Sequence, residues 1–176
     1  MDLQTDKIKI DSYLTFKLGD ESFAANVSKV LNILEMVKIT KVPKAPVYMK
    51  GVINLRGSVL PLVDTRVKFS MGETPITTNT CILVLEIDMD GENIQVGAMV
   101  DAVQEVLEIK EKDILPAPKI GSTYKNEFIE GMAKNGDDFI MILNMDLIFS
   151  TEELIELKET SVKKSADKLE NEVAEK

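Results

Sequence analysis

The stretch from Pro46 to Arg66 constrains the fold more than any other part of this chain, because it specifies a β-hairpin. Gly at the first central position of a two-residue turn suits a type II′ geometry, which predicts a turn at Gly57-Ser58 and places Arg56 at the hairpin tip. Side chains alternate between the two faces of a strand. The face expected to enter the core is purely aliphatic and consists of Ile53, Leu55, Leu60 and Leu62.

The second limb of this hairpin carries two further signals. Pro61 has no N–H to donate to a ladder, so its strand is expected to lie at a sheet edge or to be bulged there. Asp64 ends the apolar run and is expected to be the N-cap of a short helix, a position at which Asp is favoured.

Short strand patterns closed by turn residues recur along the chain and predict an all-β fold with short helices, a barrel or sandwich rather than a parallel sheet. The patterned runs are 13–18 before Gly19-Asp20, 81–88 and 94–100 around Asp88–Gly91, and 139–143 after Asn135-Gly136. Residues 28–36 mix helical and strand spacing, and a turn of helix followed by a strand is expected there.

A weak internal repeat suggests two copies of one β-rich unit. Val30, for example, is matched 73 positions later by Val103. The pseudo-repeats span about 13–67 and 80–149, within a domain of 13–149. Each copy alone would have little core, whereas two copies that share an apolar interface would be stable.

The two ends of the chain are expected to lie outside this domain. Residues 1–12 are predicted to be an N-terminal tail, since they lack the charged start and apolar centre of a signal peptide. Ser150 and Glu153 have the spacing of a capping box, which predicts a C-terminal helix to about residue 158. The rest of 150–176 has few apolar residues and is expected to be a mobile acidic tail.

Composition excludes several classes of function. The net charge of −9 disfavours binding to nucleic acid or to anionic membranes, and no apolar run is long enough to cross a bilayer. The chain has no histidine, which excludes a histidine-dependent triad, most catalytic zinc sites and phosphate transfer to this chain on histidine. Cys81 is the single cysteine and is expected to be buried and inert. These features predict a cytoplasmic protein without histidine-dependent catalysis, and no cofactor or metal is expected.

Two motifs resemble ligand sites only superficially. Asp88-x-Asp90-Gly91 lacks the glycine and acid positions of a calcium loop, so a plain hairpin turn is expected. Gly51 and Gly57 lack the Gly-Lys-Ser/Thr of a phosphate loop.

Arg56 has two interpretations that the residues alone leave open. In the first it has no role in binding and is a tip charge that is either solvated or paired with an internal acid such as Asp64 or Glu35. In the second it is a bidentate anchor for a carboxylate of a partner protein.

The chain resembles the CheW chemotaxis coupling proteins over about residues 13–150. The most specific match is Lys50-Gly51 followed by Asn54-Leu55-Arg56-Gly57 and by Asp64-x-Arg66. Further matches lie at 13–19, 23–30, 96–106, 114–118 and 128–132. The resemblance implies two SH3-like five-stranded β-barrels packed on a shared apolar interface, with a C-terminal helix.

The resemblance also implies a function as an adaptor that is not an enzyme. Such proteins connect the histidine kinase CheA, through its regulatory domain, to the cytoplasmic tips of methyl-accepting chemotaxis proteins in bacterial signal transduction. The same resemblance suggests a further partner, namely other copies of this protein in array rings. Neither nucleic acid binding nor direct membrane insertion is implied.

Site residues carried over from the family fall into two groups. The receptor-binding group is Leu14, Val30, Asn32, Ile33, Arg56, Cys81 and Val106. The kinase-binding group is Ile39, Val42, Pro43 and Gly51. Many relatives have Glu where this chain has Asn32, so a charged contact is absent at that position.

Two other functions compete with the adaptor. One is an enzyme or ligand sensor that uses the cleft between the barrels, which would need polar groups among the apolar faces. The other is the same module serving as ligand-sensing or adaptor barrel in a different chemosensory-type pathway.

Overall fold

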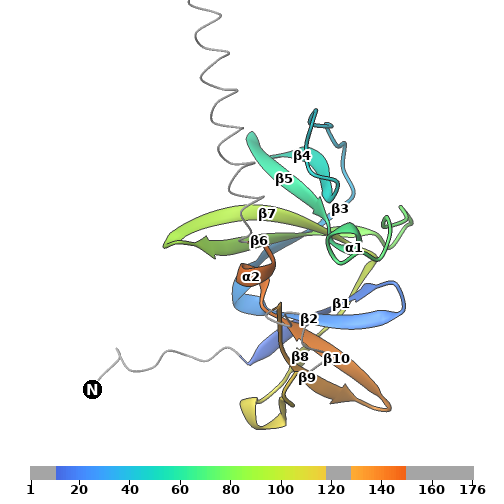
Figure 1. Ribbon diagram of the computed structural model, residues 1–176, viewed down its shortest axis with the longest axis vertical. Coiled ribbons are helices and arrows are strands. Elements are labelled where there is room, and N and C mark those ends of the chain that lie inside the picture. Colours follow the sequence, from blue (N-terminus) through green and yellow to red (C-terminus); the bar gives the residue numbers. More distant parts are fainter. Residues whose placement is uncertain (1–10, 118–127, 150–176) are drawn as a thin grey trace, which may run out of the picture.

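The computed structural model describes residues 11–117 and 128–149, which form two five-stranded sheets, each rolled into an SH3-like barrel (Figure 1). Barrel 1 has the strand order β8-β1-β2-β10-β9, and barrel 2 has the order β3-β6-β7-β5-β4. This confirms the predicted all-β class. The strands are β1 Ser12–Leu18, β2 Glu21–Asn26, β3 Val30–Glu35, β4 Met49–Leu55, β5 Ser58–Asp64, β6 Cys81–Met89, β7 Glu92–Val100, β8 Ala102–Glu108, β9 Ile129–Asn135 and β10 Asp138–Leu143.

Four short helical segments connect or follow these strands. They are the 3-10 turns η1 Val27–Lys29 and η2 Glu111–Asp113 and the α-helices α1 Thr65–Lys68 and α2 Met145–Phe149. Figure 1 shows α2 between the two barrels. Residues 28–36 form a helical turn and then a strand, as predicted, in η1 and β3. The expected helix from Ser150 and the tail after it lie outside the described residues, as do residues 1–10.

Each barrel contains strands from both halves of the chain. The β1–β2 hairpin joins β8, β9 and β10, whereas the β6–β7 hairpin joins β3, β4 and β5. The chain therefore crosses between barrels twice, at η1 and at Asp101. The two barrels use matching parallel contacts, Leu62 with Gly97 in barrel 2 and Ile142 with Ala24 in barrel 1. Barrel 2 is thus one continuous stretch of the chain, 30–100, and barrel 1 is assembled from the residues on either side of it.

The turn of the β4–β5 hairpin lies one residue earlier than predicted. Leu55 pairs with Ser58, so the turn residues are Arg56-Gly57. Their φ angles of 51° and 85° are both positive, which is the signature of a type I′ turn rather than type II′. The reason is Asn54, whose Oδ1 accepts the Gly57 N–H at 2.8 Å and stabilises this tighter turn.

The predicted core face of the hairpin survives this change, because it depends on alternation and not on the turn. Ile53 pairs with Leu60, and both are buried in the cluster that fills barrel 2, with Leu62 beside them and Leu55 packed against it.

Pro61 does not lie on an edge strand, so that alternative was wrong. β5 is an inner strand between β4 and β7. Pairing with β7 begins only at Leu62, however, so the missing N–H of Pro61 falls before that ladder begins. The bulge of this hairpin lies on the facing strand, between Met49 and Gly51.

The predicted N-cap at Asp64 is confirmed. Its Oδ1 accepts the Val67 N–H at 3.4 Å, and the same carboxylate accepts hydrogen bonds from the N–H of Thr74 at 3.0 Å and from its hydroxyl at 2.6 Å. Asp64 is buried, so these donors compensate for its loss of water.

The largest apolar cluster lies between the barrels and is called here the interbarrel cluster. It takes Leu14 and Phe16 from barrel 1 and Leu83 and Leu85 from barrel 2, and it includes Phe149 of α2. Smaller clusters fill each barrel. Because the largest core is shared, the two barrels pack as one body.

Two ion pairs fasten the crossings between the barrels. Arg66 of α1 binds Asp101 through Nε and Oδ2 at 2.7 Å, and the same oxygen accepts the Gly19 N–H at 2.6 Å. Lys29 of η1 binds Asp146 of α2 at 2.8 Å. Asp146 also accepts the Asp88 N–H of barrel 2 at 2.9 Å. Helix α1, which follows β5, and helix α2, which follows β10, are thus each tied to one crossing.

Glu130 interacts electrostatically with both members of this second ion pair. Burial, and then the Asp146 carboxylate, raise the pKa of Glu130, and Lys29 partly offsets them. A carboxyl whose pKa is raised in the folded state destabilises the fold when ionised, and this penalty disappears as the pH falls through the raised pKa.

We therefore expect Glu130→Gln to raise the melting temperature at neutral pH. Glu130 is exposed, so solvent screening keeps the gain within about 0.5 kcal/mol. Melting curves of both proteins between neutral pH and about pH 4, near the ordinary pKa of Glu, measure this difference. The two curves should converge at the acidic end, and a gain that persists there would contradict the explanation.

Candidate binding surface at the seam between the barrels

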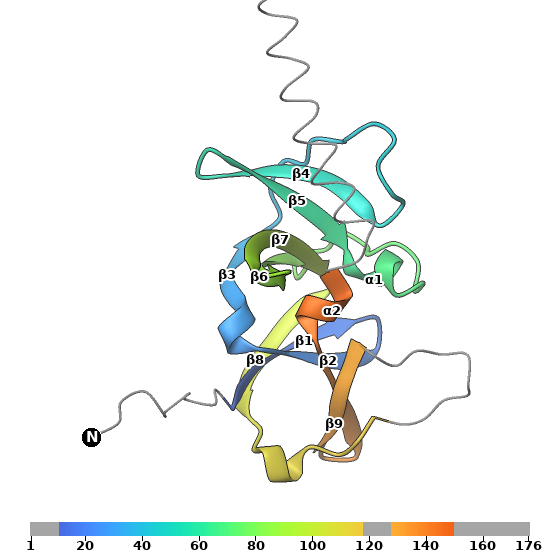
Figure 2. The same ribbon diagram turned by 60° about the vertical axis from the view of Figure 1, so that its left-hand side comes forward.

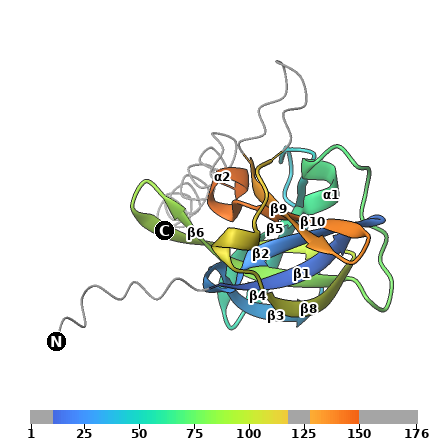
Figure 3. The same cartoon turned by 90° about the horizontal axis from the view of Figure 1, so that it is seen from below.

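β3 and β8 are the edge strands at which the interbarrel cluster reaches the surface. Figures 2 and 3 show them along the same side of the molecule, one from each barrel. Ile33 of β3 pairs with Leu83, and Val106 of β8 pairs with Leu14. Cross-strand partners share a face of the sheet. Ile33 and Val106 therefore continue the buried cluster outward, and they are 45% and 58% exposed.

The seam consists of five of the seven residues predicted to contact a receptor: Leu14, Val30, Ile33, Cys81 and Val106. Leu14 is buried, while Val30 and Cys81 are partly buried and pack against the interbarrel cluster. The Cys81 thiol approaches the backbone of Val103, so it links β6 of barrel 2 to β8 of barrel 1. Together these residues form an apolar strip with a buried floor and two exposed edges.

Cys81 is a packing group in this strip. It is partly rather than fully buried. Burial raises the pKa of its thiol, and a hydrogen bond with the backbone of Val103 partly offsets this. A raised pKa lowers the thiolate fraction, which agrees with the predicted inert role.

The other two predicted receptor residues lie outside the seam. Asn32 pairs with Val84, a member of the barrel 2 cluster, so it occupies the opposite face of β3 from Ile33. Its Oδ1 accepts the N–H of Ile33 at 2.8 Å. Leu34, two positions along the same strand, packs against that cluster too, as alternation requires. Arg56 lies in the turn between β4 and β5 of the same barrel.

Arg56 is an exposed cation without an internal partner. It forms no ion pair or hydrogen bond with any residue in the described part of the chain. Asp64 is occupied by Thr74 and α1, which rules out one of the internal acids considered above. Arg56 also holds a positive φ, which is uncommon for a residue other than Gly, Asn or Asp. The side chain is thus presented at some conformational cost.

The same turn occurs elsewhere with a more favourable residue. Asp88 accepts the Gly91 N–H at 3.0 Å, as Asn54 does for Gly57, and Asp90 takes the position of Arg56 with φ 53°. This confirms that Asp88–Gly91 is a hairpin turn. The comparison shows that the turn itself does not require arginine at position 56.

Three of the predicted kinase-binding residues, Ile39, Val42 and Pro43, lie in the segment between β3 and β4, and the fourth, Gly51, lies in β4 itself. Thr40 of this segment pairs with Val52 through N···O distances of 2.9 and 2.8 Å. Gly51 permits that approach, since a Cβ there would lie 2.3 Å from the Thr40 carbonyl oxygen and 2.8 Å from Cγ2 of Ile39. Val42 packs on the interbarrel cluster, and Pro43 is exposed. Gly51 is therefore a supporting residue rather than a contact.

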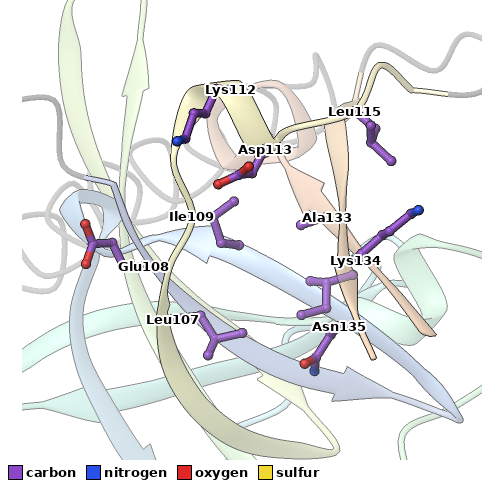
Figure 4. A pocket seen from close by; sticks show the side chains of 10 residues that line it. Leu107, Glu108, Ile109, Lys112, Asp113, Leu115, Ala133, Lys134 and Asn135 are labelled. Carbon is purple, nitrogen blue, oxygen red and sulfur yellow. The ribbon is translucent and has the colours of Figure 1, made fainter. Parts of the chain in front are cut away.

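A cavity of about 540 Å³ lies at the end of barrel 1, away from the seam (Figure 4). Its walls come from β8, η2, β9 and β10, and Figure 4 shows Lys112 and Asp113 on one wall and Lys134 and Asn135 on another. The ligand-sensor alternative placed its site between the barrels, which is not where this cavity lies. The lining residues are Leu107, Glu108, Ile109, Lys112, Asp113, Leu115, Ala133, Lys134, Asn135 and Ile140.

The described residues contain neither a metal-binding cluster nor a membrane-spanning helix. No group of three or more Cys, Asp or Glu side chains there is arranged to hold a metal ion. None of the helices in residues 11–117 and 128–149 has the length and apolar character to cross a membrane.

Sequence reasoning missed the residues that hold the seam in shape. Arg66 and Asp101 were noted only as part of a resemblance, and Asp146 and Lys29 were not singled out. Arg66 and Asp101 are 35 positions apart and Lys29 and Asp146 are 117 positions apart, so no local sequence pattern indicates either pair. The only sequence feature that could have indicated these residues is that each is a charged residue close to the end of a strand.

Two fused β-barrels with an exposed apolar seam define a protein-interaction module. Residues 12–153 match the model of the CheW-like domain family. The chain is 34% identical over 140 residues to a chemotaxis protein CheW of Rhizobium meliloti, covering 80% of this chain and 88% of that protein. It is 32% identical over 142 residues to a chemotaxis protein CheW of Klebsiella aerogenes, covering 81% and 83%.

A solved structure agrees with these sequence relatives. The crystal structure of the scaffolding protein TtCheW from Thermoanaerobacter tengcongensis aligns with a TM-score of 0.70 and 32% identity, over 81% of this chain and 89% of that one. The chain therefore belongs to the CheW-like domain family. The two sequence relatives are named chemotaxis proteins, and the protein of the solved structure is named a scaffolding protein.

Proposed function

We propose that this protein is a non-catalytic adaptor that couples methyl-accepting chemotaxis receptors to the histidine kinase CheA in the cytoplasm. The observation that carries the proposal is the seam, where the shared apolar core emerges between two exposed edges, Ile33 and Val106. Scattered single apolar residues need no explanation, but a strip continuous with the core indicates a docking surface.

The receptor tip is the proposed occupant of the seam. An antiparallel helical hairpin presents apolar anchors at regular spacing, which suits a strip bordered by Ile33 and Val106. Arg56 and Asn32, on the side of barrel 2, supply a cation and a polar group at its periphery. The Arg56 side chain is free to pair with an acid of the receptor.

The kinase is the proposed partner of the segment between β3 and β4. Pro43 is exposed there, and Ile39 and Val42 are only partly buried. Because this segment lies outside the seam, one molecule can hold both partners simultaneously. Weak individual contacts suffice in an array, since many linked sites add avidity. The pathway served is either flagellar chemotaxis or another chemosensory system.

The test is binding to two partners, a receptor cytoplasmic fragment and the CheA regulatory domain. We expect Ile33→Asp and Val106→Asp each to weaken receptor binding by at least about tenfold, since a charge would enter an apolar contact. Both positions are exposed, so melting temperatures should change little. Kinase binding should remain at the wild-type level.

Ile76→Asp is the matched control, because Ile76 is 65% exposed and lies outside both surfaces. If the seam variants bind the receptor as well as the control does, the seam is not the receptor surface. If the folded wild type binds neither partner, the adaptor function is wrong.

A further inference from the structure

The segment between β3 and β4 is basic in a chain that is otherwise acidic. Residues 36–50 contain Lys38, Lys41, Lys44 and Lys50 and no acid, whereas the whole chain has a net charge of −9. Lys38, Lys41 and Lys44 are exposed, and Lys50 is partly buried. In Figure 2 the segment runs from the end of β3 over the upper part of barrel 2 to the start of β4.

These four lysines have no partner within the part of the molecule that the structure describes. The ion pairs of Lys29 and Arg66 involve none of them, and none of the four forms an ion pair or hydrogen bond with a described residue. Four unpaired lysines on one short segment therefore leave a concentrated positive field.

Apolar side chains are exposed among the lysines. Val47 is 89% exposed and Val37 is 45% exposed, and Pro43 also faces solvent. An apolar centre with charges around it is the anatomy of a protein interface, in which the charges guide encounter and the apolar groups supply affinity.

The equivalent segment of barrel 1 carries less of this charge. It follows the edge strand β8 and reaches β9 through the bridge of Leu115 to Met132, as the basic segment follows β3 and reaches β4 through Thr40 and Val52. Its sequence from 109 to 128 has four lysines against three acids, a net charge of +1, whereas residues 36–50 have a net charge of +4. The larger basic excess thus belongs to barrel 2 and is not imposed by the shared fold.

We infer that residues 36–50 bind an acidic protein surface and that their lysines steer the approach of this partner electrostatically. The inference rests on the proposed function, because this segment is the proposed kinase-binding surface, and it adds that the facing surface of the kinase regulatory domain is acidic. A protein partner is favoured over an anionic membrane because the acidic body of this chain would be repelled by an extended anionic plane.

The test compares the wild type with the triple variant Lys38→Gln, Lys41→Gln, Lys44→Gln. Binding and association rates with the kinase regulatory domain are measured at about 0.1 M and about 1 M salt, where the Debye length falls from about 10 Å to about 3 Å. The wild type should lose affinity as salt rises. The triple variant should bind about tenfold more weakly at low salt, mainly through slower association, and should match the wild type at high salt.

Lys110→Gln combined with Lys112→Gln is the matched control and should behave as the wild type does. If the triple variant keeps both the affinity and the salt dependence of the wild type, this inference fails while the adaptor function stands. If the wild type binds no kinase domain at either salt concentration, both fail. Loss of binding to phosphatidylserine vesicles in the triple variant, with kinase binding unchanged, would overturn the inference in favour of a membrane surface.

Discussion

Replacing Arg56 by Glu is expected to weaken binding of a receptor cytoplasmic fragment by at least about tenfold without unfolding the protein. Arg56 is exposed and has no partner among the described residues, so reversing its charge breaks nothing inside the molecule. At the proposed receptor interface, by contrast, the change would replace an attraction by a like-charge contact, which costs several kcal/mol. Titration calorimetry with the receptor fragment, beside a melting curve, measures both effects.

Arg56→Asn separates the side chain from the turn. Asn tolerates a positive φ better than Arg does, so this variant should be at least as stable as the wild type while losing the cation. A variant that is more stable and still binds more weakly would show that arginine is retained for contact rather than for folding. Normal receptor binding by both variants would refute the assignment of Arg56.

Replacing Gly51 by Ala is expected to destabilise the protein by at least about 3 kcal/mol, a loss typical of severe backbone strain and displacement. A Cβ at this position would lie 2.3 Å from the carbonyl oxygen of Thr40, which is backbone and cannot rotate away. The φ of +150° adds strain for any other residue. Thermal unfolding should show a melting temperature lower by roughly 10 °C.

Gly57→Ala is the control for this prediction. Gly57 also has a positive φ, but no atom lies within 4 Å of the position of its Cβ. It should therefore cost only the backbone strain, about 1 kcal/mol. Equal destabilisation by the two substitutions would show that the approach of Thr40 to Gly51 contributes nothing. Gly51→Ala should also weaken kinase binding, because it displaces the segment between β3 and β4, which is the proposed kinase-binding surface.

The sequence predicted the strands well where the pattern was local. Alternation placed Ile53, Leu60 and Leu62 on the buried face, and this result withstood an error in the turn. The turn itself was misplaced by one residue, because the deciding hydrogen bond comes from the side chain of Asn54 rather than from the turn residues. Moving the turn by one residue shifts the pairing between the two strands by two positions, so each side chain stays on the face that alternation assigns to it.

The exchange of hairpins between the barrels could not be predicted from the sequence. Alternation indicates that the β1–β2 and β6–β7 hairpins exist, but it does not indicate which other strands they join. That choice depends on contacts such as Phe23 with Met141, which are more than 100 positions apart. The candidate site, too, could be predicted only in part. The resemblance identified the seam residues, but the face of β3 that Asn32 occupies became clear only from its pairing with Val84.

The two crossings between the barrels have a mechanical consequence. Separate domains ordinarily move relative to each other through a flexible linker. Here each connection is a strand-to-strand passage fastened by an ion pair, Lys29 to Asp146 at one and Arg66 to Asp101 at the other, and the largest apolar cluster fills the space between. The two barrels are therefore expected to move as one rigid body, with no hinge between them. A displacement at the seam would rotate the whole molecule instead of changing the angle between the barrels, so it would also move the far end of barrel 2.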